Sequence, residues 1–331
     1  MELPNIQTLK ADAAHALRRG REPKQVILWY AMLSTLLAAL TTLASLWLGN
    51  SIENYGGLGN LGTRSILSTV QTILPLVQML LAGCLELGYL HAILRICRGQ
   101  YADRTDLKVG FEKALPMLRL MALEGLLAFG VSMFTYQAAF SIFLLSPWAD
   151  PLVELAAAMS QSTSILDSGL VVTEEFAMQA VPAVVPMLVI WLVLLCLVMI
   201  PLSYRIRFAS YALLDEPRGS AFAALRSSMK MTRRNCLKLF RLDLSFWWYY
   251  GLSALATVLG SVDMLLGALG IALPMNGTLA YFLFYGLYLA ANFGICWFFM
   301  NRVQATYAMA YEALREKPAN DGVVLGSIFD V

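Results

Sequence analysis

The chain has 331 residues, of which 59% are hydrophobic and only 14% are charged, and its formal net charge is +2. Soluble domains carry about 25% charged residues, so this deficit excludes an ordinary water-soluble core and indicates that lipid is the main solvent of the chain. The small net charge offers no electrostatic footprint for nucleic acid, and we expect no nucleic-acid partner.

The N-terminal segment, residues 3–20, is predicted to form a short surface helix. Four apolar residues share one stripe of that helix, namely Ile6, Leu9, Ala13 and Leu17. A helix of this kind lies on a membrane surface rather than across it. The apolar run over residues 25–48 is too long for the hydrophobic region of a cleavable signal, so it is interpreted as a retained membrane span.

Six apolar stretches are long enough to cross a bilayer, which requires about 20 residues each. The predicted spans are residues 25–48, 66–96, 116–145, 181–204, 244–269 and 278–300. The fold class is therefore all-α, a polytopic membrane helix bundle of about six transmembrane helices with cytoplasmic amphipathic helices. We expect one integral membrane domain over residues 1–317 and a flexible C-terminal tail over 318–331.

The distribution of basic residues gives this bundle an orientation. With the N-terminus placed inside, 23 of the 24 Lys and Arg residues fall in inner segments, and only Arg64 falls outside. The long outer stretch, residues 146–179, contains acidic residues and no basic residue. Because cytoplasmic loops are enriched in Lys and Arg, we expect a multi-pass protein with both termini in the cytoplasm.

Two glutamates within the predicted spans are candidate functional residues, because an ionisable group inside a membrane is costly. Glu86 lies nine residues before Arg95, and Glu124 lies eight residues after Pro116. We expect both at similar depth on adjacent antiparallel helices, where they could share a polar cavity for a proton, a cation or a cationic headgroup. The alternative, which the pattern favours, is interhelical hydrogen bonding or snorkelling to the inner interface.

The last predicted span carries a third intramembrane polar residue, Asn292, which we interpret as a hydrogen-bonding contact between helices. Gly286, Ala290 and Gly294 recur in the same span at four-residue spacing. This spacing predicts a seam of small residues at which two helices pack closely.

The most basic inner segment, residues 219–241, is predicted to be helical. Its basic residues include Arg226, Lys230, Arg233 and Arg234. An apolar stripe at helical spacing is formed by Phe222, Leu225, Met229, Cys236 and Phe240. This pattern favours a helix on the anionic inner surface of the membrane; the alternative is a docking helix for a cytoplasmic protein partner.

No pattern typical of a catalytic or metal site is present. The two histidines, His15 and His91, stand alone, and the five cysteines lie in or beside hydrophobic stretches without ligand-like spacing. We expect buried free thiols, no catalytic residues, no metal and no cofactor, and the chain is predicted not to be an enzyme.

Three blocks of the sequence resemble DUF975, a family of bacterial integral membrane proteins of unknown function. The first begins at Leu9-Lys10-Ala11, and the second runs from Gly88-Tyr89 through Arg95 and Asp106-Leu107 to Gly110-Phe111. The third and most specific contains Leu214-Asp215-Glu216-Pro217 and Leu242-Asp243-Leu244-Ser245-Phe246. Arg234-Asn235 stands where the family often has a Gly-Asn turn, so a less tight turn is expected. The resemblance covers about residues 6–312 and implies a multi-pass protein of the bacterial cytoplasmic membrane, without implying an activity.

Two functions remain open from the sequence. The first is a transport or permease-like membrane component for a small or lipidic solute, which requires a water-accessible cavity that reaches Glu86 and Glu124. The second is a non-catalytic membrane scaffold or regulator whose basic inner helices bind anionic inner-leaflet lipids or a cytoplasmic partner.

Overall fold

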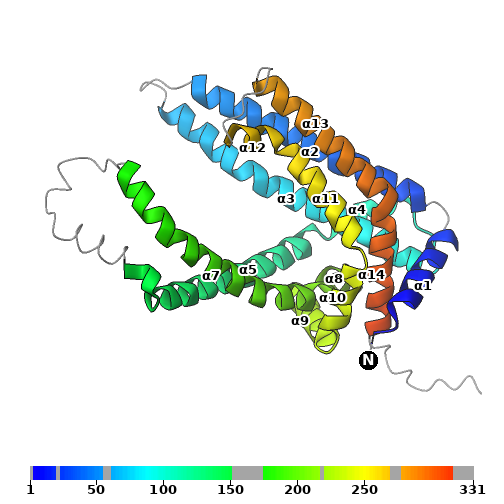
Figure 1. Ribbon diagram of the computed structural model, residues 1–331. Helices are drawn as coiled ribbons and strands as arrows, with labels where there is room; N and C mark the ends of the chain where they lie inside the picture. Colours follow the sequence, from blue (N-terminus) through cyan, green and yellow to red (C-terminus); the bar gives the residue numbers. More distant parts are fainter. Residues whose placement is uncertain are drawn as a thin grey trace, which may run out of the picture. The chain divides into compact units, whose positions relative to one another are not determined.

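The computed structural model describes residues 3–19, 23–54, 61–150, 174–216, 220–268 and 277–315, and every regular element in these ranges is helical (Figure 1). The α-helices are α1 (Ile6–Arg19), α2 (Pro23–Asn54), α3 (Leu61–Cys97), α4 (Leu107–Glu112), α5 (Ala114–Leu144), α7 (Glu174–Ile206), α8 (Ala209–Asp215), α9 (Ala221–Thr232), α10 (Cys236–Leu244), α11 (Trp247–Gly260), α12 (Val262–Ala268), α13 (Gly277–Ile295) and α14 (Asn301–Leu314). Short 3₁₀ turns form η2 (Arg104–Asp106) and η3 (Pro147–Ala149), and η4 (Cys296–Met300) is π-helical. The all-α prediction is confirmed for these ranges.

Five helical stretches within these ranges are long and apolar enough to cross a membrane. They are Lys24–Ile52, Gly62–Cys97, Ala114–Leu144, Val185–Asp215 and Leu279–Leu314. Each overlaps one of the predicted spans, so the architecture is compatible with an integral membrane protein. The predicted tail over residues 318–331 lies outside the described residues.

The fifth predicted span, residues 244–269, is divided mainly between α11 and α12. The division lies at Ser261, whose hydroxyl donates to the carbonyl oxygens of Thr257 (3.0 Å) and Val258 (3.3 Å). Hydroxyl groups that bond to the preceding turn compete with the helical hydrogen bonds and bend or end a helix. As a result α11 contains 14 residues, fewer than the roughly 20 that a single straight span requires.

Contacts between residues divide the chain into two units. Unit 1 comprises Met1–Leu120 and Arg207–Val331, and unit 2 comprises Met121–Ile206. Unit 2 contains most of α5 together with η3 and α7. Its small core joins Phe143 and Ala149 to Met187, and the rings of Tyr136 and Trp191 meet edge to face at 6.3 Å.

In unit 1, α2 and α3 pack along each other, α13 packs against α2 and α11, and α14 packs against α1 and α3 (Figure 1). Tyrosines fix several of these contacts. Tyr30 and Tyr89 stack with ring centroids 4.5 Å apart, and the Tyr89 hydroxyl donates to Asn301 Oδ1 at 2.7 Å. The hydroxyl of Tyr285 lies 2.6 Å from that of Thr42. These bonds satisfy polar groups between helices, where an unpaired polar atom would be costly.

Two glycines allow α3 and α4 to touch through their backbones. A Cβ atom added at Gly110 would overlap the carbonyl oxygen of Cys84, and one added at Gly88 would overlap that of Leu107. Only glycine fits such an approach, because every other residue would push the two helices apart.

The predicted seam of small residues on α13 is wrong for the described part of the chain. Added Cβ atoms at Gly286 or Gly294 would meet no atom within 4 Å. The close contact of α13 uses another face, on which Tyr288 lies against Gly260 of α11. A tyrosine of α13, rather than one of its small residues, therefore makes this close contact with α11.

The predicted apolar stripe over residues 222–240 does not run along a single helix. Phe222 is 65% exposed and Phe240 is 45% exposed. Helix α9 buries Leu225 of this stripe together with the smaller residues Ala221, Ala224, Ser228 and Thr232. A turn separates α9 from α10, so the two halves of the stripe do not share one helix.

Candidate functional site

The polar chemistry of unit 1 gathers in a region that we call the basic end, formed by α1, η2, α4, α8, α9, α10 and the adjoining ends of α3, η4 and α14. Three carboxylates organise the ion pairs described here: Asp106, Asp215 and Asp243. All three belong to the sequence blocks that resemble DUF975.

Asp215, at the end of α8, joins α8 to α3 and α14. Arg98 donates from both terminal nitrogens to the two carboxylate oxygens, at 2.9 and 2.7 Å, and Tyr311 donates to Oδ2 at 2.9 Å. Arg98 also donates to Glu312 Oε1 at 2.6 and 2.8 Å, and Arg315 lies 3.2 Å from Asp215 Oδ2. Paired, planar contacts of this kind are the strongest hydrogen bonds available to arginine.

The charge of Arg98 is secured by this arrangement. Burial alone would lower its pKa, but the hydrogen bonds and charges of Asp215 and Glu312 outweigh burial and raise it above the ordinary value for arginine. The cluster therefore keeps its cation at any pH at which the protein is folded.

Asp243, on α10, connects this helix to α14. Arg207 donates to Asp243 Oδ2 at 3.0 Å and Tyr307 donates to Oδ1. The guanidinium of Arg207 also lies over the Tyr307 ring, 4.2 Å from its centroid, and donates to the hydroxyl of Tyr250 at 3.1 Å. Asp243 is thus held in place by a cation and a phenol at once.

Asp106 closes the turn between α3 and α4 and is only 5% exposed. It accepts a hydrogen bond from Arg95 at 2.6 Å and one from the backbone N–H of Asp103 at 2.9 Å. The Nδ1 atom of His91 lies 3.7 Å from the same carboxylate. A carboxylate buried to this extent requires such partners.

The remaining motif residues also make contacts within the basic end. Leu242 and Phe246 are buried, and the Ser245 hydroxyl donates to the Leu242 carbonyl at 2.5 Å. The Leu214 carbonyl accepts from Lys113 Nζ at 2.8 Å. Leu244 is 59% exposed. Pro217 lies outside the described residues.

The predicted basic residues Arg226, Lys230, Arg233 and Arg234 all have exposed side chains. Three of them, excluding Arg226, line a cavity of about 620 Å³ that we call the α9 cavity. Asp215 and Glu216 line it as well, so its cations face carboxylates.

The predicted intramembrane residues do not line the α9 cavity. Glu86 is exposed on α3 of unit 1, Glu124 is partly buried on α5 of unit 2, and Asn292 is partly buried on α13. None of the three lines a cavity described in this section. A polar cavity shared by the two glutamates stays a prediction.

A second cavity of about 730 Å³, the aromatic cavity, lies between α1, the start of α2, the start of α11 and the η4–α14 segment. Its aromatic wall consists of Phe246, Trp248, Trp297 and Phe298. Its basic residues are Lys10, Arg18, Lys24 and Arg302. None of the described residues that line it is acidic, so the described part of the wall supplies no counter-charge for its cations.

Lys10 is the most restrained of these four cations. Its ammonium group donates to the carbonyl oxygen of Ser245 at 3.1 Å and lies 4.2 Å from the centroid of the Phe246 ring. Burial lowers the pKa of Lys10 below the ordinary value for lysine. A nearby anion would counteract that effect by favouring the charged form.

The wall of the aromatic cavity includes an irregular helical segment. Trp297 and Phe298 belong to the π-helix η4, which interrupts the regular hydrogen bonding between α13 and α14. Short π-helical segments are frequent at functional sites because they redirect side chains. Here Phe298 is left 67% exposed at the cavity.

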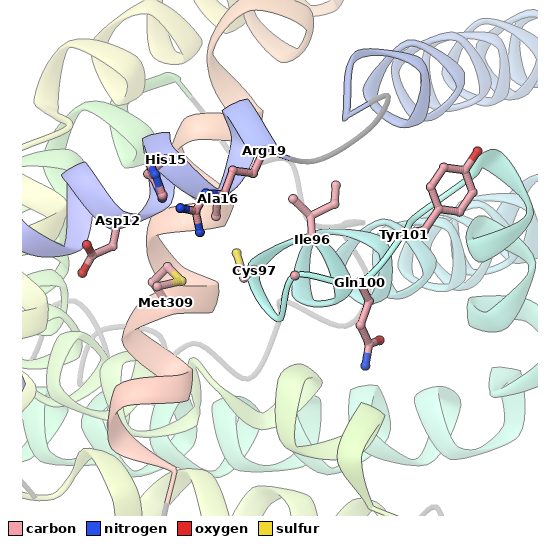
Figure 2. A pocket seen from close by; sticks show the side chains of 10 residues that line it. Asp12, His15, Ala16, Arg19, Ile96, Cys97, Gln100, Tyr101 and Met309 are labelled. Atoms are coloured by element: carbon pink, nitrogen blue, oxygen red, sulfur yellow. The ribbon is translucent and has the colours of Figure 1, made fainter.

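A third cavity, of about 560 Å³, contains charges of both signs (Figure 2). Figure 2 shows Asp12, His15 and Arg19 on α1, with Cys97 and Met309 among the residues opposite them. The Cys97 thiol lies 3.7 Å from the carbonyl oxygen of Ala305. Among the described residues, no group of three His, Cys, Asp or Glu side chains is placed to hold a metal ion.

Sequence reasoning identified the basic residues of the aromatic cavity only as members of inner segments. Nothing local connects Lys10 with Arg302, because tertiary contacts bring α1 to α14. A usable signal was the pair Trp297-Phe298 next to Arg302, since aromatic and basic residues together are typical of a membrane interface.

Comparisons of the chain with family models, curated proteins and solved structures find no match. The resemblance to DUF975 therefore stays a prediction from the motif residues.

Proposed function

We propose that this protein is a multi-pass protein of the bacterial cytoplasmic membrane that binds anionic inner-leaflet lipid through the basic end of unit 1, as a non-catalytic scaffold or regulator. In this proposal both termini lie in the cytoplasm, as the distribution of Lys and Arg predicts. The mode of binding is that of an interfacial helix.

One observation carries the proposal: an exposed apolar face on α10 that continues to the start of α11. Leu237 is 78% exposed, Leu244 59% and Trp247 70%, and Phe240 follows the same helical spacing at 45%. Large apolar side chains are rarely grouped on a water-exposed helix face without a partner. A bilayer interface would cover this face.

Basic side chains flank the exposed face. Arg233, Arg234 and Arg241 are exposed in the turn before α10 and on α10 itself, and Arg226 is exposed on α9. Near an anionic leaflet each basic residue contributes about 1 kcal/mol of attraction. Apolar insertion and charge attraction therefore favour the same orientation of α10.

The test of the apolar face uses tryptophan quenching. The full chain is placed in bilayer nanodiscs that contain lipids brominated near the headgroup, and wild type is compared with Trp247→Phe. We expect quenching of the fluorescence contributed by Trp247, obtained as the difference between the two proteins. A Trp247 contribution quenched by aqueous iodide but not by brominated lipid would contradict the proposal.

The charge contribution is tested by lipid retention. Wild type is compared with a triple variant in which Arg226, Arg233 and Arg234 are replaced by Gln. Each protein is extracted from bilayers of phosphatidylcholine and phosphatidylglycerol, and native mass spectrometry counts the lipids that remain bound. The variant should retain less phosphatidylglycerol and an unchanged amount of phosphatidylcholine. Lys108→Gln, at an exposed lysine on α4, is the matched control; equal phosphatidylglycerol retention by all three proteins would contradict the proposal.

Transport of a proton or cation is the second candidate function, and one observation favours it. Glu86 is exposed although it lies within Gly62–Cys97, one of the apolar stretches long enough to cross a membrane. An ionisable residue at such a position is a candidate for an ion pathway. Proteoliposomes with a pH-sensitive dye inside test it: flux that disappears in Glu86→Gln supports transport, and wild-type flux equal to that of empty liposomes rejects proton transport.

A cytoplasmic protein partner is an alternative ligand for the basic side chains of α9 and of the turn that follows it. It would bind at the exposed side chains of Arg226, Lys230, Arg233 and Arg234. Pull-downs with and without neutral substitutions at these four positions separate this outcome from lipid binding, because a protein partner would be lost without any change in phosphatidylglycerol retention.

A further inference from the structure

The aromatic cavity differs in its charge from the α9 cavity and from the third cavity. Four basic side chains line it and no acidic one does among its described lining residues, whereas the α9 cavity contains Asp215 and Glu216 and the third cavity contains Asp12. Like charges held together repel one another unless an anion lies between them. The cavity is therefore suited to an anionic ligand.

The four cations come from three different parts of the chain. Lys10 and Arg18 project from α1, Lys24 from the start of α2, and Arg302 from the start of α14. A phosphate group offers several acceptor oxygens, and arginine binds such a group through two parallel hydrogen bonds. Convergence from separate elements allows one phosphate to be contacted from several sides.

Lys10 is already oriented for such a ligand. One of its three ammonium donors bonds to the Ser245 carbonyl, and the face of Phe246 restrains the group further. Holding the side chain in place before binding lowers the entropy cost of using it.

The apolar half of the cavity points to a ligand that is more than a free phosphate. Trp248, Trp297 and Phe298 form its aromatic wall together with Phe246, and Phe298 is 67% exposed. Tryptophan and phenylalanine next to basic residues are suited to the boundary between headgroups and acyl chains. The volume of about 730 Å³ lies in the range of small-molecule sites, about 300 to 1,000 Å³.

We infer that the aromatic cavity is a discrete site for the headgroup of one anionic glycerophospholipid. Arg302, Arg18 and Lys24 contact the phosphate together with Lys10, and the glycerol and first acyl carbons lie along Trp297 and Phe298. This site rests on the proposed function in one respect, that the basic end faces the inner leaflet. It goes further by assigning a single, saturable position apart from the exposed face of α10.

The test measures lipid retention by the full chain in detergent. Phosphatidylglycerol or phosphatidylcholine is titrated into delipidated protein, and native mass spectrometry counts the bound molecules. We expect one phosphatidylglycerol that saturates before any other and no equivalent phosphatidylcholine. Arg302→Gln should weaken this first binding step about tenfold, because it removes a charge-assisted contact. Arg302→Lys should restore part of it.

Matched variants separate this site from the general lipid surface. Lys108→Gln should leave the first binding step unchanged, and so should the triple Gln variant of Arg226, Arg233 and Arg234. Loss of the first step in the triple variant but not in Arg302→Gln would overturn the site while leaving the proposed function intact. The reverse result, which we expect, would support the site, and the wider lipid surface is then tested by the later phosphatidylglycerol molecules, of which the triple variant should retain fewer.

A competition experiment distinguishes the two sources of phosphate. Glycerol phosphate and inorganic phosphate are added to protein that carries one phosphatidylglycerol. Retention of the lipid at phosphate concentrations far above that of the lipid supports a phospholipid site. Displacement at equal concentrations would overturn the inference in favour of a free phosphate site. Circular dichroism of each variant confirms that the helices are retained.

Discussion

The basic end has two sides that differ in how their cations are balanced. On one side they are paired with carboxylates, and on the other they are grouped together. On the side formed by α3, α4, α8 and α14, Arg95 and Arg98 are bonded to carboxylates, and the backbones of α3 and α4 touch at two glycines. On the side of the aromatic cavity, four cations share a wall whose described residues include no acidic one. Charges that are paired and close-packed hold the helices together, whereas a group of like charges implies a ligand that is not part of the chain.

Gly110→Ala tests the close-packed side and should have the largest effect. The new methyl group would overlap the carbonyl oxygen of Cys84, which belongs to the backbone and cannot rotate away. We expect a loss of at least about 3 kcal/mol in the free energy of unfolding, because overpacking moves whole helices. Unfolding of the purified protein in detergent, followed by circular dichroism, measures it.

Gly251→Ala is the matched control for Gly110→Ala. An added Cβ at Gly251, on α11, meets no atom within 4 Å. Alanine there should stabilise the protein slightly, by up to about 1 kcal/mol, because glycine is the less favourable residue inside a helix. Equal stability of the two variants would show that the α3–α4 contact is looser than described.

Asp215→Ala tests the paired charges and should have the next largest effect. It would leave Arg98 and Arg315 near each other without the carboxylate that both contact. We expect the free energy of unfolding to fall by about 2 to 4 kcal/mol, since Glu312 would then be the only described carboxylate left to balance two partly buried cations. Thermal unfolding in lipid-free detergent provides the measurement.

Glu216→Ala removes the adjacent carboxylate of the same motif. Glu216 makes no ion pair with any described residue in the contacts given above, so its removal should change stability by no more than about 0.5 kcal/mol. If both variants were equally stable, the paired side would not depend on the Asp215 contacts, and the comparison between the two sides would fail.

The sequence predicted the helices far better than their contacts. Apolar runs of adequate length determine where helices form, because backbone groups in lipid must be paired within the helix. The division of one predicted span at Ser261 was missed, since it depends on hydroxyl bonds to the preceding turn rather than on hydropathy.

The site was less accessible to sequence reasoning. Arg98 and Asp215 are 117 positions apart, and Arg98 and Glu312 are 214 apart, so no local period connects them. The resemblance to DUF975 did select Asp106, Asp215 and Asp243, which are the carboxylates that organise the paired contacts. It did not select Arg302, whose position depends on the packing of α14 against α1.

Lys10→Met tests whether a cation of the aromatic cavity also holds α1 in place. Methionine retains a long apolar stem like that of lysine, but it removes the hydrogen bond to Ser245 and the charge above Phe246. We expect a loss of about 1 kcal/mol and faster hydrogen exchange in α1, because one net hydrogen bond is worth roughly that much. Lys24→Met, at an exposed lysine of the same cavity, should leave both quantities unchanged; similar behaviour of the two variants would show that Lys10 does not hold α1.

Arg302→Gln should have the smallest effect on the lipid-free protein, with a free energy of unfolding within about 0.5 kcal/mol of wild type. Like Asp215→Ala, it removes one charged side chain from the basic end, but we expect a much smaller loss. No described carboxylate lines the aromatic cavity, so none of the described residues loses a counter-charge, and the repulsion among the remaining cations decreases. The difference should appear when phosphatidylglycerol is added, because a ligand that binds only the folded state raises its stability by mass action. The unfolding temperature of wild type should then rise with lipid concentration more than that of Arg302→Gln. Thermal unfolding at increasing lipid concentration measures both. An Arg302→Gln protein that unfolds as readily as Asp215→Ala without lipid would mean that Arg302 holds the helices together, and that the two sides use their cations in the same way.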